Sequence, residues 1–534
     1  MLHENLLITL LLLFAVSMMI MLGQKLKISY PIFLVIAGLL ITFIPGVPHF
    51  KISADWVFMV ILPPLLYQAA WNTPWNNFWK WKRSIVMLAF GLVLFTSCIV
   101  AYFSNAFIPG FTMPLGLLLG AIISPPDAIA ANSVLQDMKV PRQTVTILEG
   151  ESLLNDAASL IVFRFALEAV LTGRFVKEEV AAAFIVVGFM GIVIGIAFAA
   201  LFYFIHRYLP TTPSMDATLE IIAPYFMYLV AEHYGYSGVM AVVSGGLFMS
   251  SKSVKLHNYA ISRMHSAAVG SVIVYILNGL VFILIGLQLP LVVAGLQGYS
   301  ITEALKYAVV ISLLTIIVRM LWLFFTSFVP GWLSSKIRTK AVKQSWQSVF
   351  VISWAGMRGV VSLASALSLP IVLNDGQLFP QRNLILFITF TVILVTLVFQ
   401  GITLPFLVRF LKFDEEKPVI PNSVQEADIN KRLLAIALKE LNENYTCDVA
   451  ENEMLQRFKL ELERDLLLHS QILASDKPDI RNVDRFGHVT NNILRNLRAE
   501  LSRMRKENYF DEDVLKKREK QMDLDEVRLY HHTH

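Results

Sequence analysis

The sequence has 534 residues, of which 56% are hydrophobic and only 16% are charged. A soluble protein of this length cannot hide that much apolar surface, so the composition excludes a soluble protein and predicts a polytopic membrane protein. The two cysteines, Cys98 and Cys447, lie in unlike segments and predict no disulfide. The net charge of +5 carries no signal for a nucleic-acid partner.

The charges divide the chain into two parts. Residues 413–534 hold 20 Lys/Arg and 25 Asp/Glu, which leaves 25 and 15 for residues 1–412. We therefore expect a transmembrane domain over 1–412 and a cytoplasmic helical domain over 413–534. The tail contains no nucleotide-binding loop or catalytic set, so it is either a solvated domain that supports dimer contacts or a regulatory domain that senses pH or a ligand.

Apolar runs predict the architecture of the first domain, an all-α bundle. Thirteen of them can cross about 30 Å of hydrocarbon as helices, and they cover residues 5–22, 28–44, 54–70, 84–106, 114–135, 143–172, 180–205, 217–232, 236–250, 264–289, 303–329, 346–369 and 384–410. One set of alternate loops carries fifteen Lys and Arg residues and the other carries five. Because basic loops stay in the cytoplasm, this bias predicts an external N-terminus and a cytoplasmic tail.

The fifth run cannot form one continuous helix. Pro125 and Pro126 have no amide hydrogen, so the backbone should open just before Asp127, near the middle of the membrane. We expect a second half-helix with Ser124 as its N-cap and Pro125 at its first position. Its positive end favours an ionised Asp127, which either takes part in ion binding or merely caps the half-helix.

The twelfth run repeats this pattern. Gly356 and Gly359 flank Arg358 at the middle of the run and allow a second interruption. Two broken, crossing helices in corresponding positions are typical of inverted repeats of six helices around a seventh, which place a substrate site where the breaks meet.

Polar residues of the sixth run fall on one helical face. At 100° per residue, Ser152 and Asp156 share that face, Asn155 borders it, and Glu149 lies on it two turns toward the cytoplasm. Buried ionisable groups in a membrane are costly and usually functional. We therefore expect this face to meet the gap in the fifth run, with Glu149 at the mouth of a cytoplasmic funnel.

Glu151 points about 140° away from Asp156 by the same arithmetic. An unpaired arginine in lipid is intolerable, so Arg358 is the expected partner of Glu151 in a structural ion pair. Asp156 is then left facing the gap.

The predicted site is a small oxygen-rich cage around one or two carboxylates, suited to a partly dehydrated monovalent cation. A buried carboxylate that accepts either a proton or a cation, but not both, is the minimal chemistry of exchange. The alternative is a cation channel whose buried acids select ions. The sequence contains no phosphate-binding loop or phosphorylation motif, which excludes a transport ATPase. We expect neither an enzyme nor a bound cofactor or metal centre.

Four motifs resemble those of the monovalent cation/proton antiporter family, which includes bacterial NhaP-type transporters and eukaryotic sodium/proton exchangers. They lie in order along residues 1–410 and are Leu62-Pro-Pro-Leu-Leu-Tyr, Ser124-Pro-Pro-Asp-Ala-Ile-Ala, Glu151-Ser-Leu-Leu-Asn-Asp-Ala and Gly356-Met-Arg-Gly-Val-Val-Ser-Leu-Ala.

The resemblance implies thirteen helices in a homodimer of a bacterial inner membrane, with a six-helix core that moves against a dimerisation domain. It implies that Asp156 carries Na⁺, Li⁺ or K⁺ in exchange for H⁺, with supporting roles for Asp127, Ser152 and Asn155. The Asn-Asp form of the motif goes with electroneutral one-for-one exchange.

Two positions depart from the family pattern. This chain has Pro126-Asp127-Ala128 where many members have Thr-Asp-Pro, and Gln68 where many have an acid. Both differences bear on how the cation is coordinated and which cation is preferred.

Overall fold

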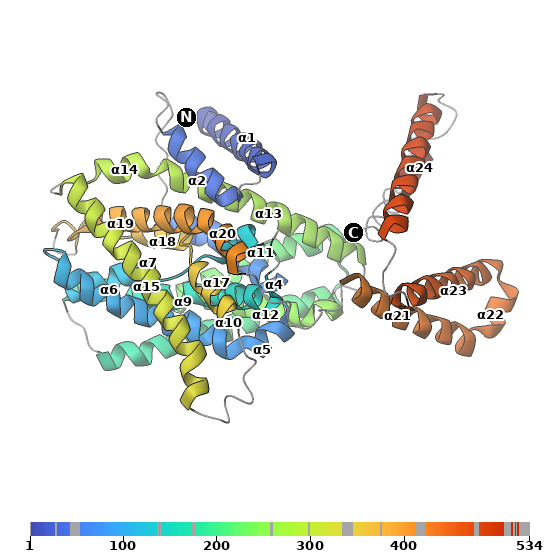
Figure 1. Ribbon diagram of the computed structural model, residues 1–534, viewed down its shortest axis with the longest axis horizontal. Helices are drawn as coiled ribbons and strands as arrows, with labels where there is room; N and C mark the ends of the chain where they lie inside the picture. Colours follow the sequence, from blue (N-terminus) through green and yellow to red (C-terminus); the bar gives the residue numbers. More distant parts are fainter. Residues whose placement is uncertain are drawn as a thin grey trace. The chain divides into compact units, whose positions relative to one another are not determined.

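The computed structural model describes residues 2–26, 29–42, 54–135, 138, 140–173, 177–256, 260–296, 299–333, 345–373, 376–411, 422–474, 480–506, 514–515, 518–519 and 521–522. It divides into two compact units, Met1–Phe413 and Asp414–His534. Figure 1 shows both, with the first unit coloured from blue to orange and the second from orange to red.

Regular structure in the described part of the chain is helical, apart from one isolated bridge between Val372 and Leu378. The first half of unit 1 contains α1 (Leu2–Leu26), α2 (Tyr30–Ile41), α3 (Ala54–Trp56), the π-helix η1 (Val57–Ile61), α4 (Leu62–Asn72), α5 (Trp75–Val86), η2 (Met87–Leu92), α6 (Val93–Phe107), α7 (Met113–Ile123), α8 (Ala128–Leu135) and α9 (Arg142–Thr172). The second half contains α10 (Lys177–Tyr208), α11 (Pro213–His233), α12 (Gly238–Leu256), α13 (Ala260–Leu287), α14 (Leu289–Ala294), α15 (Ile301–Leu333), α17 (Trp346–Trp354), α18 (Val360–Leu367), α19 (Arg382–Leu394), η3 (Val395–Gln400) and α20 (Gly401–Leu411).

The all-α class is confirmed, and helix occupies part of every predicted apolar run. Within the described residues, six helical stretches are long and apolar enough to cross a membrane by length and composition; they are Trp75–Phe107, Met113–Leu135, Ala183–Tyr208, Ser262–Ala294, Ile301–Phe328 and Arg382–Leu411. The count of thirteen spans, the inverted repeats and the orientation stay predictions.

Close packing fixes the position of α7. A Cβ atom at Gly120 would come 2.6 Å from the Cα of Ser97 on α6, and one at Gly116 would come 2.7 Å from the Cα of Ala101. Only glycine permits such an approach, and small residues let helices pack tightly where lipid gives no hydrophobic driving force. The first half of the broken helix is thus held against α6.

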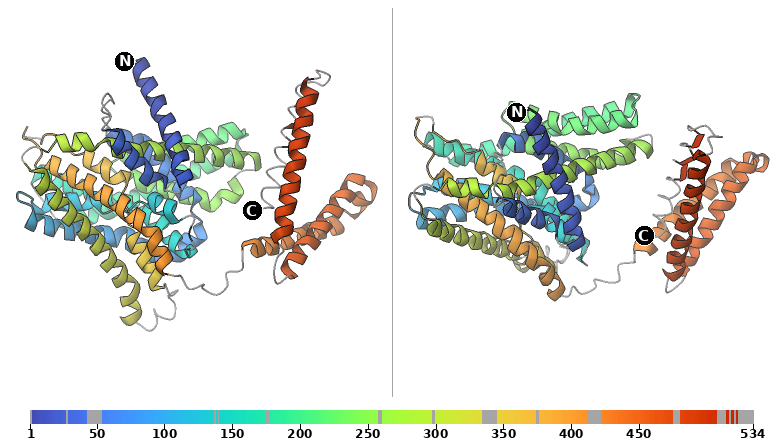
Figure 2. Two further views of the ribbon diagram at one scale, coloured as in Figure 1. Left: turned by 45° about the horizontal axis from the view of Figure 1, so that its top comes forward. Right: turned by 90° about the horizontal axis from the view of Figure 1, so that it is seen from above.

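Both predicted interruptions are present. Residues 124–127 separate α7 from α8, and residues 355–359 separate α17 from α18. The two breaks touch directly, because the backbone N–H of Asp127 donates to the carbonyl of Met357 over 2.6 Å. Figures 1 and 2 show the helices around this crossing, α7 and α9 in cyan tones and α17 to α20 in yellow to orange.

One local prediction at the first break is wrong. Ser124 ends α7, where its hydroxyl donates to the carbonyl of Ala121 over 3.1 Å, and it is not the N-cap of the second half-helix. The two prolines lie in the break, where residues 124–127 have no helical structure after the end of α7. Helix α8 begins only at Ala128, and Asp127 caps it by accepting the N–H of Ile129 at 2.8 Å.

The second unit is also helical. It contains α21 (Asn422–Asn444), α22 (Thr446–Glu451), α23 (Glu453–Ala474) and α24 (Ile480–Lys506), and α21 packs against α23. These helices carry i,i+4 ion pairs that are largely exposed to solvent, such as Arg432 with Asp428 and Arg457 with Glu453.

Candidate functional site

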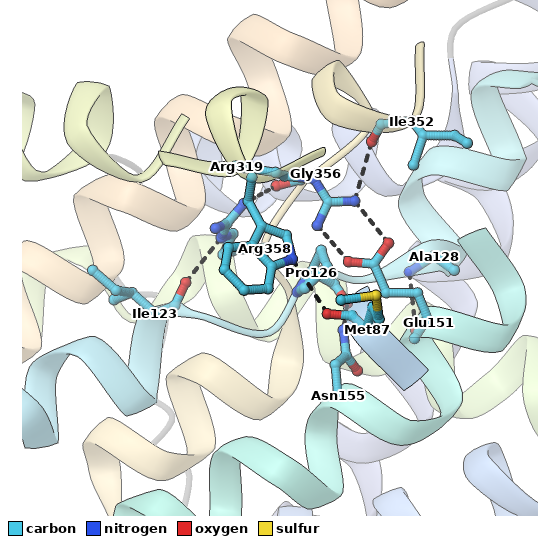
Figure 3. Close-up of polar contacts among 12 residues, drawn as sticks. Met87, Ile123, Pro126, Ala128, Glu151, Asn155, Arg319, Ile352, Gly356 and Arg358 are labelled. Atoms are coloured by element: carbon cyan, nitrogen blue, oxygen red, sulfur yellow. Dashed lines mark hydrogen bonds and ion pairs between the residues drawn. The ribbon is translucent and has the colours of Figure 1, made fainter. Parts of the chain in front are cut away.

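Helix α9 presents two polar side chains to the first break. The side-chain amide of Asn155 donates to the carbonyl of Pro126 over 2.8 Å, and the hydroxyl of Ser152 accepts the N–H of Ala128 at 3.2 Å. Prolines at the break leave backbone groups without helical partners, and these two side chains satisfy one group on each side of Asp127. Figure 3 labels Asn155 and the two backbone partners, Pro126 and Ala128.

A cavity of about 270 Å³ lies at the crossing. Its polar lining includes Asp156 and Ser152 from α9 and Asp127 from the first break, and Pro125, Pro126 and Gly359 line it as well. Asp156 is 9% exposed, so its carboxylate is nearly withdrawn from the surface. The three elements thus place two carboxylates and a hydroxyl around one small space.

Asp127 lies against the start of α18. A Cβ atom at Gly359 would collide with the carboxylate of Asp127 and would come 2.8 Å from its Cβ, so only glycine fits there. Asp127 therefore lies at the N-termini of two half-helices, α8 and α18. Both termini carry partial positive charge and favour a negative carboxylate between them.

The buried acid Glu151 pairs with an arginine of α15. Arg319 donates to both carboxylate oxygens of Glu151, at 2.5 and 2.9 Å, and also to the carbonyl of Ile352 at 3.1 Å. The side chains of Arg319 and Glu151 are 0% and 1% exposed. This is a fully buried two-pronged pair, the strongest geometry for an arginine with a carboxylate.

The predicted pair between Glu151 and Arg358 is therefore wrong. Arg358 is buried too, but it donates to the carbonyls of Ile123, at 2.9 Å, and Gly356 (Figure 3). These carbonyls lie at the C-terminal ends of α7 and α17, where helical partners are missing and partial negative charge collects. A helical wheel gives the direction of Glu151 but not which of two arginines reaches it. Arg319 also satisfies a carbonyl at the end of a broken helix, through its bond to Ile352.

The crossing holds two buried arginines and two acids that can balance them. Arg319 and Arg358 carry positive charge, and Glu151 and Asp127 balance it if both are ionised. Asp156 also lines the cavity of about 270 Å³, and no arginine is bonded to it among the described residues.

Glu149 lines the same cavity and also a larger one of about 1300 Å³. Its carboxylate accepts the side-chain amide of Asn132 at 3.0 Å, and Asn132 lines both cavities as well. Gln68 lines the larger cavity and lies against Gly270 rather than beside Asp156. The two spaces adjoin at Glu149.

Two broken helices that cross, with helix N-termini at an acid and arginines at the opposite carbonyls, are typical of a secondary transporter. Residues 10–410 match the family described as "Sodium/hydrogen exchanger, transmembrane". The chain belongs to this sodium/hydrogen exchanger family and is a multi-pass membrane protein.

Two similar relatives are both described as a "Sodium, potassium, lithium and rubidium/H(+) antiporter". The one from Bacillus pumilus is 32% identical over 79% of this chain and 64% of its own length. The one from Bacillus subtilis is 34% identical over 71% of this chain and 58% of its own length. The chain thus spans about three fifths of the length of these relatives.

The fold is similar to that of the sodium proton antiporter MjNhaP1 from Methanocaldococcus jannaschii. The match has a TM-score of 0.60 and 20% sequence identity, and it covers 75% of this chain and 99% of that structure.

Proposed function

We propose that this protein is an electroneutral antiporter that exchanges one monovalent cation for one proton at Asp156. The observation that carries the proposal is the cavity at the crossing, where Asp156 faces Asp127 and Ser152. The descriptions of the Bacillus relatives support an alkali cation, with Na⁺ as the main substrate and Li⁺ and K⁺ as further ones.

Exchange follows from the balance of charges. A bare buried carboxylate is costly, so either a proton or a cation is bound to Asp156 whenever the site changes the side of the membrane to which it opens. Asp127 stays ionised between two helix N-termini and contributes a constant charge, with Ser152 and Asn155 shaping the space around it. One acid that swaps one positive charge for another moves no net charge per cycle.

Access to the site follows from the adjoining cavities. A cation enters the larger space, passes Glu149 and reaches Asp156, and Glu149 raises the local cation concentration on the way. The ion leaves on the other side of the membrane by alternating access, in which the helices around the crossing move against the rest of a homodimer. We place the N-terminus outside and the C-terminal unit in the cytoplasm of a bacterial inner-membrane protein.

Proteoliposomes loaded with a pH-sensitive dye test the proposal. Wild-type protein should move protons in response to gradients of Na⁺, Li⁺ or K⁺, at a rate that an imposed voltage does not change. Asp156→Asn should abolish this movement while the protein still folds, and Asp55→Asn, at an exposed acid of α3, should not. Cation movement without coupled protons, carrying current, would instead show a channel.

A further inference from the structure

One hydroxyl at the crossing has no partner. Ser362, the third residue of α18, is 1% exposed and lines the cavity that holds Asp127 and Asp156. Its Oγ is one of two buried polar side-chain atoms that lack a hydrogen bond among the described residues of this cavity. The other is Oδ1 of Asn132, a residue whose side-chain N–H donates to Glu149 and which also lines the larger cavity.

The break explains why this hydroxyl is unpaired. A serine inside a helix usually donates to the carbonyl three or four residues earlier. For Ser362 those carbonyls belong to Gly359 and Arg358, which lie in the break and not in a helical turn. Ser353 on α17 shows the usual arrangement, because its hydroxyl donates to the carbonyl of Phe350 over 2.8 Å.

A buried hydroxyl without a partner is costly, and the cost is removed when a ligand accepts or supplies the missing contact. The neighbouring hydroxyl, Ser152, already accepts the N–H of Ala128. Ser362 therefore offers the cavity a neutral oxygen with both lone pairs available. Neutral oxygens of this kind replace water around a partly dehydrated alkali cation.

We propose that Ser362 is a ligand of the transported cation and helps to determine which alkali cation is preferred. The ligand set then spans both broken helices, with Asp156 and Asp127 on one side and Ser362 of α18 on the other. This inference rests on the proposed function and extends it to a residue of the second broken helix. Selectivity among alkali cations depends on how ligand contacts compare with the water that they replace, so losing the Ser362 oxygen should affect Li⁺, Na⁺ and K⁺ unequally.

The test compares half-saturating concentrations of Li⁺, Na⁺ and K⁺ for proton exchange in proteoliposomes. For Ser362→Ala we expect a roughly tenfold rise for Na⁺, the loss of one contact to a charged group, and rises of different size for Li⁺ and K⁺, so that the order or spacing of the three concentrations changes. Ser362→Thr keeps the hydroxyl and should retain most of the wild-type preference. Ser353→Ala, which removes a hydroxyl already bonded within its own helix, should leave all three concentrations unchanged.

A purely structural role would lower the maximal rate equally for the three ions and leave their half-saturating concentrations alone, and that result overturns the inference. Unchanged concentrations in a folded Ser362→Ala protein overturn it as well. If the alanine variant does not fold, Ser362→Cys gives the same test, because it keeps the volume and replaces a hard oxygen by a soft sulfur. Failure of the wild-type protein to exchange any of the cations for protons would refute the proposed function itself.

Discussion

Removing the charge of Glu151 tests how the buried charges are paired. In Glu151→Gln, Arg319 stays fully buried but loses its carboxylate, to which it donates at 2.5 and 2.9 Å. Breaking a buried ion pair by removing one partner costs about 3–5 kcal/mol. Arg319 keeps its bond to the carbonyl of Ile352, which offsets only part of the loss.

A double-mutant cycle separates the two candidate partners. Combining Glu151→Gln with Arg319→Met removes both charges, so the double variant should be more stable than the sum of the single losses predicts, by about 1–3 kcal/mol. The matched cycle with Arg358→Met should show a smaller coupling, because Arg358 bonds to backbone carbonyls instead. The assay is thermal unfolding of purified protein in lipid nanodiscs, followed by intrinsic fluorescence. A coupling with Arg358 that equals or exceeds the one with Arg319 would refute the pairing.

Two further variants probe the crossing. Gly359→Ala should reduce the exchange rate much more than it lowers the unfolding temperature, because the added methyl group collides with Asp127. Overpacking of this kind costs about 1–3 kcal/mol of stability. A variant with the wild-type exchange rate would show that Asp127 is free to shift. Asn155→Ala leaves the buried carbonyl of Pro126 without its donor and should destabilise the protein by about 1–3 kcal/mol in the same unfolding assay. Unchanged stability would mean that water replaces the side-chain amide.

The sequence predicts the features of this fold that depend on local chemistry. Pro125 and Pro126 lack the amide hydrogens of a regular helix and so favour an interruption, and glycines around Arg358 permit a second break. Helical periodicity within one run also places Ser152 and Asn155 on the side of the break. These inferences need only the chemistry of one segment, so they can be made without knowing which helices are neighbours.

The ion pair depends on which helices are neighbours, and periodicity does not determine that. Glu151 has two buried arginines within the crossing region, and the choice between them depends on where the carbonyls of Ile123, Ile352 and Gly356 lie. The sequence signal that bears on Arg319 is an arginine in the middle of a long apolar run, which must find a buried acceptor.

The pairing of the buried charges bears on which helices can move together. Glu151, Arg319, Arg358 and Asp127 lie on α9, on α15 and in the two breaks, and each is compensated by a group of these same elements. If α7, α8, α9, α15, α17 and α18 move together, no buried charge loses its partner, so the desolvation cost of the fixed charges is the same at both ends of the motion. In the exchange cycle that we propose, Asp156 alone changes partner. The barrier to movement in that cycle is high when Asp156 is bare and low when a proton or a cation occupies it, which is the coupling that exchange requires.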